Sequence, residues 1–115
     1  MKTKIIERKE IEQAIECLKM GGVVAFPTDT VYGLGVIYDE LEALERLKLS
    51  KGRPEEKPIP MMIGSKEQLE MVAFTNEKVE RLIEAFMPGG FTIILKKKAC
   101  VSDQVTNGFD TIALR

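Results

Sequence analysis

The chain has 115 residues, of which 44% are hydrophobic and 30% are charged, and its net charge is −1. These values are typical of a single globular domain. They exclude binding to nucleic acid or to an anionic membrane that is driven by the overall charge of the protein. The chain has no histidine and only Cys17 and Cys100 as thiols, which excludes Ser-His-Asp and Cys-His nucleophilic sites and zinc centres built on imidazole or on several cysteines.

The same totals predict where the protein works. The longest apolar stretches are too short to cross a bilayer, so we expect no membrane span. The N-terminus has no long apolar stretch before its charges resume, and no secretory signal is visible. We therefore expect a cytoplasmic protein with reduced cysteines and no resident metal site.

The first half of the chain predicts a helix followed by two strands. Apolar side chains recur at helical spacing over residues 9–20, and Gly21-Gly22 ends that helix. Residues 23–26 are continuously apolar before Pro27, which predicts a buried strand. Residues 36–38 are expected to form a second short strand.

A second helix follows those strands. Asp39 is the expected N-cap, with Glu42 completing a capping box, and the helix is expected to run to about Leu49. Residues 59–63 then predict a strand whose prolines limit how many of its amides can bond within a sheet.

The second half predicts two further helices and two strands. Ser65 with Gln68 forms another capping-box start, and residues 75–86 predict a helix with Val79, Leu82, Ile83 and Phe86 on one face. A Pro-Gly turn at 88–90 leads into a strand at 91–95, and the lysines at 96–98 are expected to end that strand in solvent. Residues 103–110 are expected to be a polar loop, and residues 111–115 a last strand.

Helices and strands alternate along the whole chain. This order predicts an α/β fold, a twisted open mixed sheet with helices packed on it, forming a single domain over residues 1–115. The predicted last strand reaches the final residue, so we expect the domain to be incomplete at its C-terminus. The oligomeric state is left open, although an exposed last strand is a candidate for pairing with a second chain.

The most distinctive segment is Lys51–Pro58, with sequence KGRPEEKP. Side chains two apart in an extended segment point the same way, so Lys51 and Arg53 can address one ligand, while the prolines stiffen the path to Lys57. Two ammonium groups and a guanidinium that converge suit a polyphosphate. The alternative is a solvated charged loop after a helix.

A polar segment follows the first predicted strand. Residues 26–35, FPTDTVYGLG, offer two threonine hydroxyls, a carboxylate and Tyr32 at a strand end, where α/β sheets commonly bind ligands. The alternative is a capped turn in which Asp29 and Thr30 satisfy their own backbone and Gly33 supplies a positive φ. The lysines at 96–98 could contact RNA phosphates, although lysines that blunt a strand end are the favoured interpretation.

Together, FPTDTVYGLG and KGRPEEKP resemble the motifs of the YrdC-like family of threonylcarbamoyl-adenylate synthases. The order of the elements from about Gly21 to Arg115 is also similar to that family. The resemblance implies the joining of L-threonine, bicarbonate and ATP into threonylcarbamoyl-AMP, with release of pyrophosphate. It implies Mg²⁺ that arrives with ATP, and a product that feeds the tRNA threonylcarbamoyl transfer machinery.

The resemblance also assigns the site residues. It implies that Lys51, Arg53 and Lys57 bind the ATP phosphates, Lys51 and Arg53 as catalytic residues. It implies that Thr28, Tyr32 and Arg115 bind threonine. Family members continue into a Ser-x-Asn segment that this chain lacks, so part of the nucleotide pocket is expected to be missing.

Two alternatives stay open at this point. One is a non-catalytic module that binds nucleotide, double-stranded RNA or tRNA. The other is a carbamoyl-adenylate-forming domain of the hydrogenase-maturation type, with a different acceptor.

Overall fold

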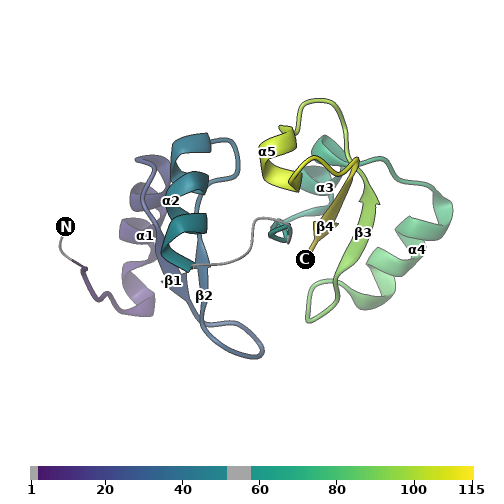
Figure 1. The fold of residues 1–115 in the computed structure, drawn as a ribbon. Helices are drawn as coiled ribbons and strands as arrows, with labels where there is room; N and C mark the ends of the chain where they lie inside the picture. The colour runs from purple at the N-terminus through teal and green to yellow at the C-terminus, as the bar shows by residue number, and fades with distance from the viewer. Residues whose placement is uncertain (1–2, 52–57) are drawn as a thin grey trace. The chain divides into compact units, whose positions relative to one another are not determined.

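A computed structural model describes residues 3–51 and 58–115, with Lys51 described by its backbone alone. The chain divides into two compact units, Met1–Gly52 and Arg53–Arg115. Figure 1 shows the elements of both units as a ribbon. The assignment of residues 1–115 to a single domain stays a prediction.

The first unit opens with a helix whose glycine ending is as predicted. A short 3₁₀ turn, η1 (Arg8–Glu10), leads into α1 (Ile11–Lys19). The amide of Gly21 donates to the Leu18 carbonyl at 3.0 Å and that of Gly22 to the Cys17 carbonyl at 2.8 Å. Gly21 has φ 82°, the left-handed conformation that this pair of bonds requires and that glycine adopts without a Cβ penalty.

A hairpin and a second helix complete this unit. Strands β1 (Val24–Phe26) and β2 (Gly33–Gly35) pair antiparallel, and α1 contacts β1. Helix α2 (Leu41–Lys51) buries Ala43, Leu44 and Leu47. From α2, the Arg46 guanidinium donates to the Gly21 carbonyl, so α2 also holds the end of α1.

Three details of this unit differ from the sequence predictions. The strand predicted to be buried is only partly so: Ala25 is exposed, and its neighbours Val24 and Phe26 are half-buried. A two-stranded hairpin with α1 against it leaves one face open. The second strand is β2 rather than residues 36–38. Helix α2 begins at Leu41, one residue later than a helix capped by Asp39 would begin.

The second unit is built around a small sheet. Strands β3 (Ile93–Lys96) and β4 (Thr111–Leu114) pair antiparallel, with Ile93 opposite Leu114. The predicted strand at 59–63 is reduced to one bridge, in which Met61 lies parallel to Leu114. The amide of Met61 donates to the Ala113 carbonyl at 2.8 Å and that of Ile63 to the Arg115 carbonyl at 2.9 Å, while Pro60, just before Met61, has no amide to offer. Parallel and antiparallel pairing therefore meet at β4, as the prediction of a mixed sheet requires.

The second unit also contains three helices, α3, α4 and α5 in chain order. Helix α3 (Lys66–Val72) starts where predicted: the Ser65 hydroxyl accepts from the Gln68 amide at 3.2 Å, and the Gln68 side chain accepts from the Gly64 amide at 2.7 Å. Helix α4 (Glu77–Phe86) is capped by Asn76. The last, α5 (Asp103–Thr106), lies where a polar loop was predicted, and Ser102 caps it.

The core of the second unit is apolar, and residues from the whole length of that unit contribute to it. Helix α4 presents the predicted face, although of its four residues only Ile83 is buried. The buried apolar side chains of this unit are Met61, Leu69, Val72, Ala73, Ile83, Ile93, Leu95, Val101, Val105, Ile112 and Leu114.

Of the lysines at 96–98, Lys96 at the end of β3 is exposed as predicted, whereas Lys97 and Lys98 do not extend into solvent. Lys97 is 12% exposed, pairs with Asp103 at 3.1 Å and donates to the Val101 carbonyl at 2.8 Å. Lys98 donates to the Glu70 carbonyl at 2.6 Å and lies 5.6 Å from the centre of the Phe74 ring. A lysine stem is long enough to reach back over the fold, and both ammonium groups stabilise it by doing so.

Candidate functional site

The loop between β1 and β2 is organised by Thr28. Its hydroxyl accepts from the Thr30 amide at 3.2 Å, donates to the Val31 carbonyl and lies 3.4 Å from the Thr30 hydroxyl. These contacts close a turn of the kind that threonine side chains stabilise. The loop therefore contains a turn closed by a side chain, as the capped-turn alternative expected, but the bonds come from Thr28. The role of Thr28 toward a ligand stays a prediction.

The strands that carry this loop are set by an aromatic ring over glycine. Phe26 pairs with Gly33, and a Cβ placed on Gly35 would lie 2.8 Å from the Phe26 ring, closer than real Cβ atoms come. Gly33 lies in extended β2, so the expectation that it supplies a positive φ is wrong. The glycines of the segment make room for the ring. Tyr32 is 76% exposed, so its ring is available to a ligand.

Of the three cations in the segment Lys51–Pro58, the structure describes only Lys51, and that by its backbone alone. Lys51 is the last residue of α2, and its side chain lies outside the described part of the chain. Arg53 and Lys57 lie within 52–57, also outside the described residues. The assignment of these three cations to the ATP phosphates therefore stays a prediction.

Arg115 follows β4 directly. Its amide donates to the Met61 carbonyl and its carbonyl accepts from the Ile63 amide, each at 2.9 Å. Since side chains alternate along a strand, Arg115 is directed to the same face as Ala113 and Thr111, opposite to buried Leu114. The last strand is thus held on two sides, by β3 and by the Met61 segment, and the expectation that it is exposed for pairing is wrong.

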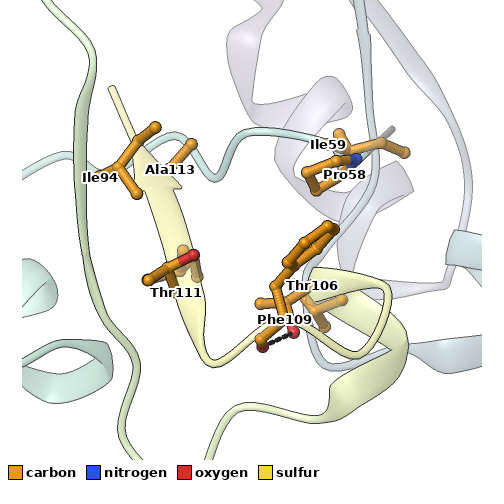
Figure 2. A pocket seen from close by; sticks show the side chains of 9 residues that line it. Pro58, Ile59, Ile94, Thr106, Phe109, Thr111 and Ala113 are labelled. Carbon is orange, nitrogen blue, oxygen red and sulfur yellow. Dashed lines mark hydrogen bonds between the residues drawn. The ribbon is translucent and has the colours of Figure 1, made fainter. Parts of the chain in front are cut away.

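A small pocket of about 60 Å³ opens on this face of β4. In Figure 2, Phe109, Pro58 and Ile59 face Thr111, Ala113 and Ile94. The Thr106 hydroxyl donates to the Phe109 carbonyl at 2.8 Å, which fixes the turn after α5 that forms one wall. The complete lining is Pro58, Ile59, Ile94, Val105, Thr106, Phe109, Thr111, Ile112 and Ala113.

The structure thus brings some of the predicted residues together. Thr28 and Tyr32 share one loop of the first unit, and Arg115 belongs to the second unit. Sequence reasoning missed the pocket face of β4, although the alternation of residues 111–115 already separates Thr111 and Ala113 from the buried side chains. Among residues 3–51 and 58–115, no group of three or more cysteine, aspartate or glutamate side chains is placed to hold a metal ion. None of the helices described is long and apolar enough to cross a membrane.

The fold and the loop after β1 define an α/β protein with polar side chains at a strand end, the usual position of a ligand site in this class. The family model described as Telomere recombination, Sua5/YciO/YrdC, matches residues 16–115. The chain belongs to this family. The predicted fold class is confirmed with it.

Individual relatives agree. The chain is 41% identical over 111 residues to a threonylcarbamoyl-AMP synthase of Pyrococcus abyssi, covering 96% of this chain and 33% of the relative. It is 40% identical over 108 residues to one of Bacillus subtilis, covering 92% and 31%. Among solved structures, P. abyssi Sua5 complexed with L-threonine matches with a TM-score of 0.89 at 41% identity, over 97% of this chain and 33% of that one. The chain spans about a third of the length of these relatives.

Proposed function

We propose that the chain contributes to L-threonylcarbamoyladenylate synthesis, the activity by which both curated relatives are named. The observation that carries the proposal is 41% identity over 96% of this chain to such a synthase. The match of this chain to a relative complexed with L-threonine supports threonine as the amino-acid substrate. ATP and bicarbonate are the other proposed substrates, with Mg²⁺ entering as the ATP complex, and the cytoplasm is the proposed site of action.

The chemistry suits a site without histidine. The amine of threonine combines with bicarbonate to give a carbamate and water. A carbamate oxygen then attacks the α-phosphorus of ATP, forming the new P–O bond as the bond to the bridging oxygen breaks and pyrophosphate leaves. Such a displacement depends chiefly on positioning and on neutralising charge. Lys51, Arg53 and Lys57 are proposed for the phosphates, and Thr28, Tyr32 and Arg115 for threonine.

The two alternatives have less support. The names of the relatives favour the synthase over a carbamoyl-adenylate-forming domain with another acceptor. An RNA-binding module would use exposed cations, but Lys97 and Lys98 are engaged within the fold. Contact with double-stranded RNA or tRNA, and with the downstream transfer machinery, stays a prediction.

The proposal is tested by pyrophosphate release and by calorimetry on the 115-residue chain. Release that requires both threonine and bicarbonate is the expected result, and Lys51→Ala and Arg53→Ala are each expected to reduce it at least a hundredfold, the scale of losing one group that stabilises transition-state charge. Lys96→Ala is the matched control, since this exposed lysine lies outside the cationic segment. Release with carbamoyl phosphate in place of threonine and bicarbonate would overturn the proposal, and so would RNA binding with no binding of threonine or ATP.

A further inference from the structure

The side chain of Arg46 joins two elements of the first unit. Its guanidinium, in the middle of α2, donates to the carbonyl of Gly21, which lies between the end of α1 and the start of β1. This carbonyl belongs to a well-anchored part of the backbone, because Gly21 is buried and its own amide donates to the Leu18 carbonyl at 3.0 Å. Arg46 is not among the residues proposed to contact a substrate.

The two elements that Arg46 joins lead to two groups of proposed site residues. Strand β1 runs into the loop that carries Thr28 and Tyr32, and α2 ends at Lys51. Lys51 lies about 7.5 Å along the helix axis from Arg46, at a rise of about 1.5 Å per residue. In Figure 1, β1 and α2 run in the same direction, so the loop and the end of α2 lie toward the same end of the first unit. The position of α2 relative to β1 therefore sets the separation of Thr28 and Lys51.

The hydrophobic contacts of α2 fix that position only in part. Its buried side chains are Ala43, Leu44 and Leu47. Burial of apolar surface is non-directional, so it holds the helix against the unit but resists a small slide along the helix axis only weakly. A hydrogen bond has a preferred length and angle. The bond from Arg46 to the Gly21 carbonyl therefore adds the register of α2 against the start of β1.

Both geometry and charge suit arginine to this contact. Gly21 has φ 82°, and a Cβ placed on it would lie 3.4 Å from a guanidinium nitrogen of Arg46, so the absence of a side chain leaves the approach open. The cation also lies at the C-terminal end of α1, where the helix dipole favours positive charge. A lysine at position 46 keeps the charge and a donor, whereas a methionine keeps neither.

We propose that Arg46 is a positioning residue for the synthase reaction, and that its bond to Gly21 holds Lys51 in register with the loop that carries Thr28. The inference rests on the proposed function and deepens it by naming a residue outside the substrate contacts. Within the first unit, threonine would contact the loop after β1, and the ATP phosphates would contact the end of α2. Each substrate can bind to its own element, whereas joining them requires the two elements in register. A misplacement of about 1 Å that originates far from the reacting atoms can cost about 100-fold in rate.

The test measures pyrophosphate release by the 115-residue chain with threonine, bicarbonate and ATP, and separates kcat from the KM of threonine and of ATP. The variants are Arg46→Met, Arg46→Lys and Arg46→Gln, the last of which keeps a shorter, uncharged donor. Arg81→Met is the control, since Arg81 is an exposed arginine of the second unit whose pair with Glu77 spans 3.9 Å. Urea unfolding followed by circular dichroism gives the stability of each variant, and kcat is measured where each is fully folded.

Arg46→Met is expected to lower kcat by about 10- to 100-fold while both KM values stay within about twofold of the wild type. Arg46→Lys is expected to restore most of kcat, and Arg81→Met to leave it unchanged. If Arg46→Met does not fold, Arg46→Gln decides, with an expected loss in kcat of about tenfold.

Two outcomes would overturn the positioning role while the proposed function stands. One is a less stable variant with wild-type kcat, because Arg46 would then only stabilise the fold. The other is a rise in the KM of one substrate with kcat unchanged, because Arg46 would then act on the binding of that substrate alone. If the wild type shows no release that requires both threonine and bicarbonate, the proposed function fails, and the positioning role fails with it.

Discussion

The chain contains two antiparallel hairpins that are held together in different ways. In β1–β2 an aromatic ring lies over glycines, and none of the residues in these two strands is fully buried. In β3–β4 the residues alternate between buried and outward positions, and the Met61 segment adds a parallel bridge. One sheet is fixed by a close local fit, and the other by a hydrophobic core.

This difference has a functional side. The β1–β2 hairpin carries a loop with exposed Tyr32 and a turn closed by Thr28, so it presents polar groups on a small scaffold. The β3–β4 sheet holds Arg115 and the pocket on its outer face while its inner face is packed. On β3–β4 the packed side chains and the proposed ligand contacts therefore lie on opposite faces, whereas in β1–β2 stability and the proposed contacts depend on the same few residues.

The largest expected effect is on the packed sheet. Leu114→Ala removes a fully buried side chain, and core Leu→Ala changes cost about 2–5 kcal/mol of the free energy of unfolding. Urea unfolding followed by circular dichroism measures this change. Both tyrosines, Tyr32 and Tyr38, lie in the first unit, so their fluorescence reports that unit alone. A matching shift in tyrosine fluorescence would mean that the two units unfold together.

The control for that prediction lies across the same sheet. Ile94→Ala removes a side chain of similar size from the outward face, and the expected loss is about 0.5 kcal/mol or less. If both variants lose the same stability, the distinction between the inner and outer faces of the sheet is wrong.

The second prediction concerns the glycine hairpin. Gly35→Ala places a Cβ 2.8 Å from the Phe26 ring and forces it to move, which is expected to cost about 1–3 kcal/mol. Gly33→Ala is the matched control, since its nearest neighbour, the Thr28 methyl group, would lie at 3.4 Å. Tyrosine fluorescence during urea unfolding measures both. Equal losses for the two variants would contradict the proposed role of the ring.

Local patterns in the sequence predicted several elements of both units. The helix ends at Ser65 and Gly21 and the strand before Arg115 are short-range features, and each forms where its local chemistry places it. The second strand of the first unit was placed three residues too late, because glycines are poor strand formers unless a neighbouring ring needs the space. That ring, Phe26, is seven residues away from Gly33, beyond the reach of periodicity.

The candidate site was less predictable than the fold. The motif at 26–35 identified the loop, but the internal hydrogen bonds of Thr28 depend on the exact turn. The lysines after β3 were misjudged for a similar reason. Their partners at Val101 and Glu70 are a backbone carbonyl in a loop and another in a helix, and composition alone gives no sign of either.

The third prediction tests the half-buried lysine that joins β3 to the α5 region. Lys97→Met removes the bond to the Val101 carbonyl and the pair with Asp103, and is expected to cost about 1–2 kcal/mol. Asp103→Asn is expected to cost less, because Asp103 is largely exposed and exposed ion pairs contribute about 0–1 kcal/mol. Urea unfolding at low and at 1 M salt measures both variants. A Lys97→Met variant as stable as Lys96→Met would show that the buried contacts contribute nothing.

The smallest expected effect returns to the loop of the first hairpin. Thr28→Val keeps the shape of the side chain but removes the hydroxyl that bonds to the Thr30 amide and the Val31 carbonyl. The loss of stability is expected to be about 0.5–1.5 kcal/mol, and Thr28→Ser, which keeps the hydroxyl, is expected to restore most of it. Tyrosine fluorescence measures the stability, and calorimetry measures threonine binding in the same variants. If Thr28→Val weakens threonine binding while stability is unchanged, the hydroxyl acts on the ligand. If stability and threonine binding both fall and Thr28→Ser restores both, the hydroxyl acts through the turn. The loop must have its shape before Tyr32 can contact a substrate.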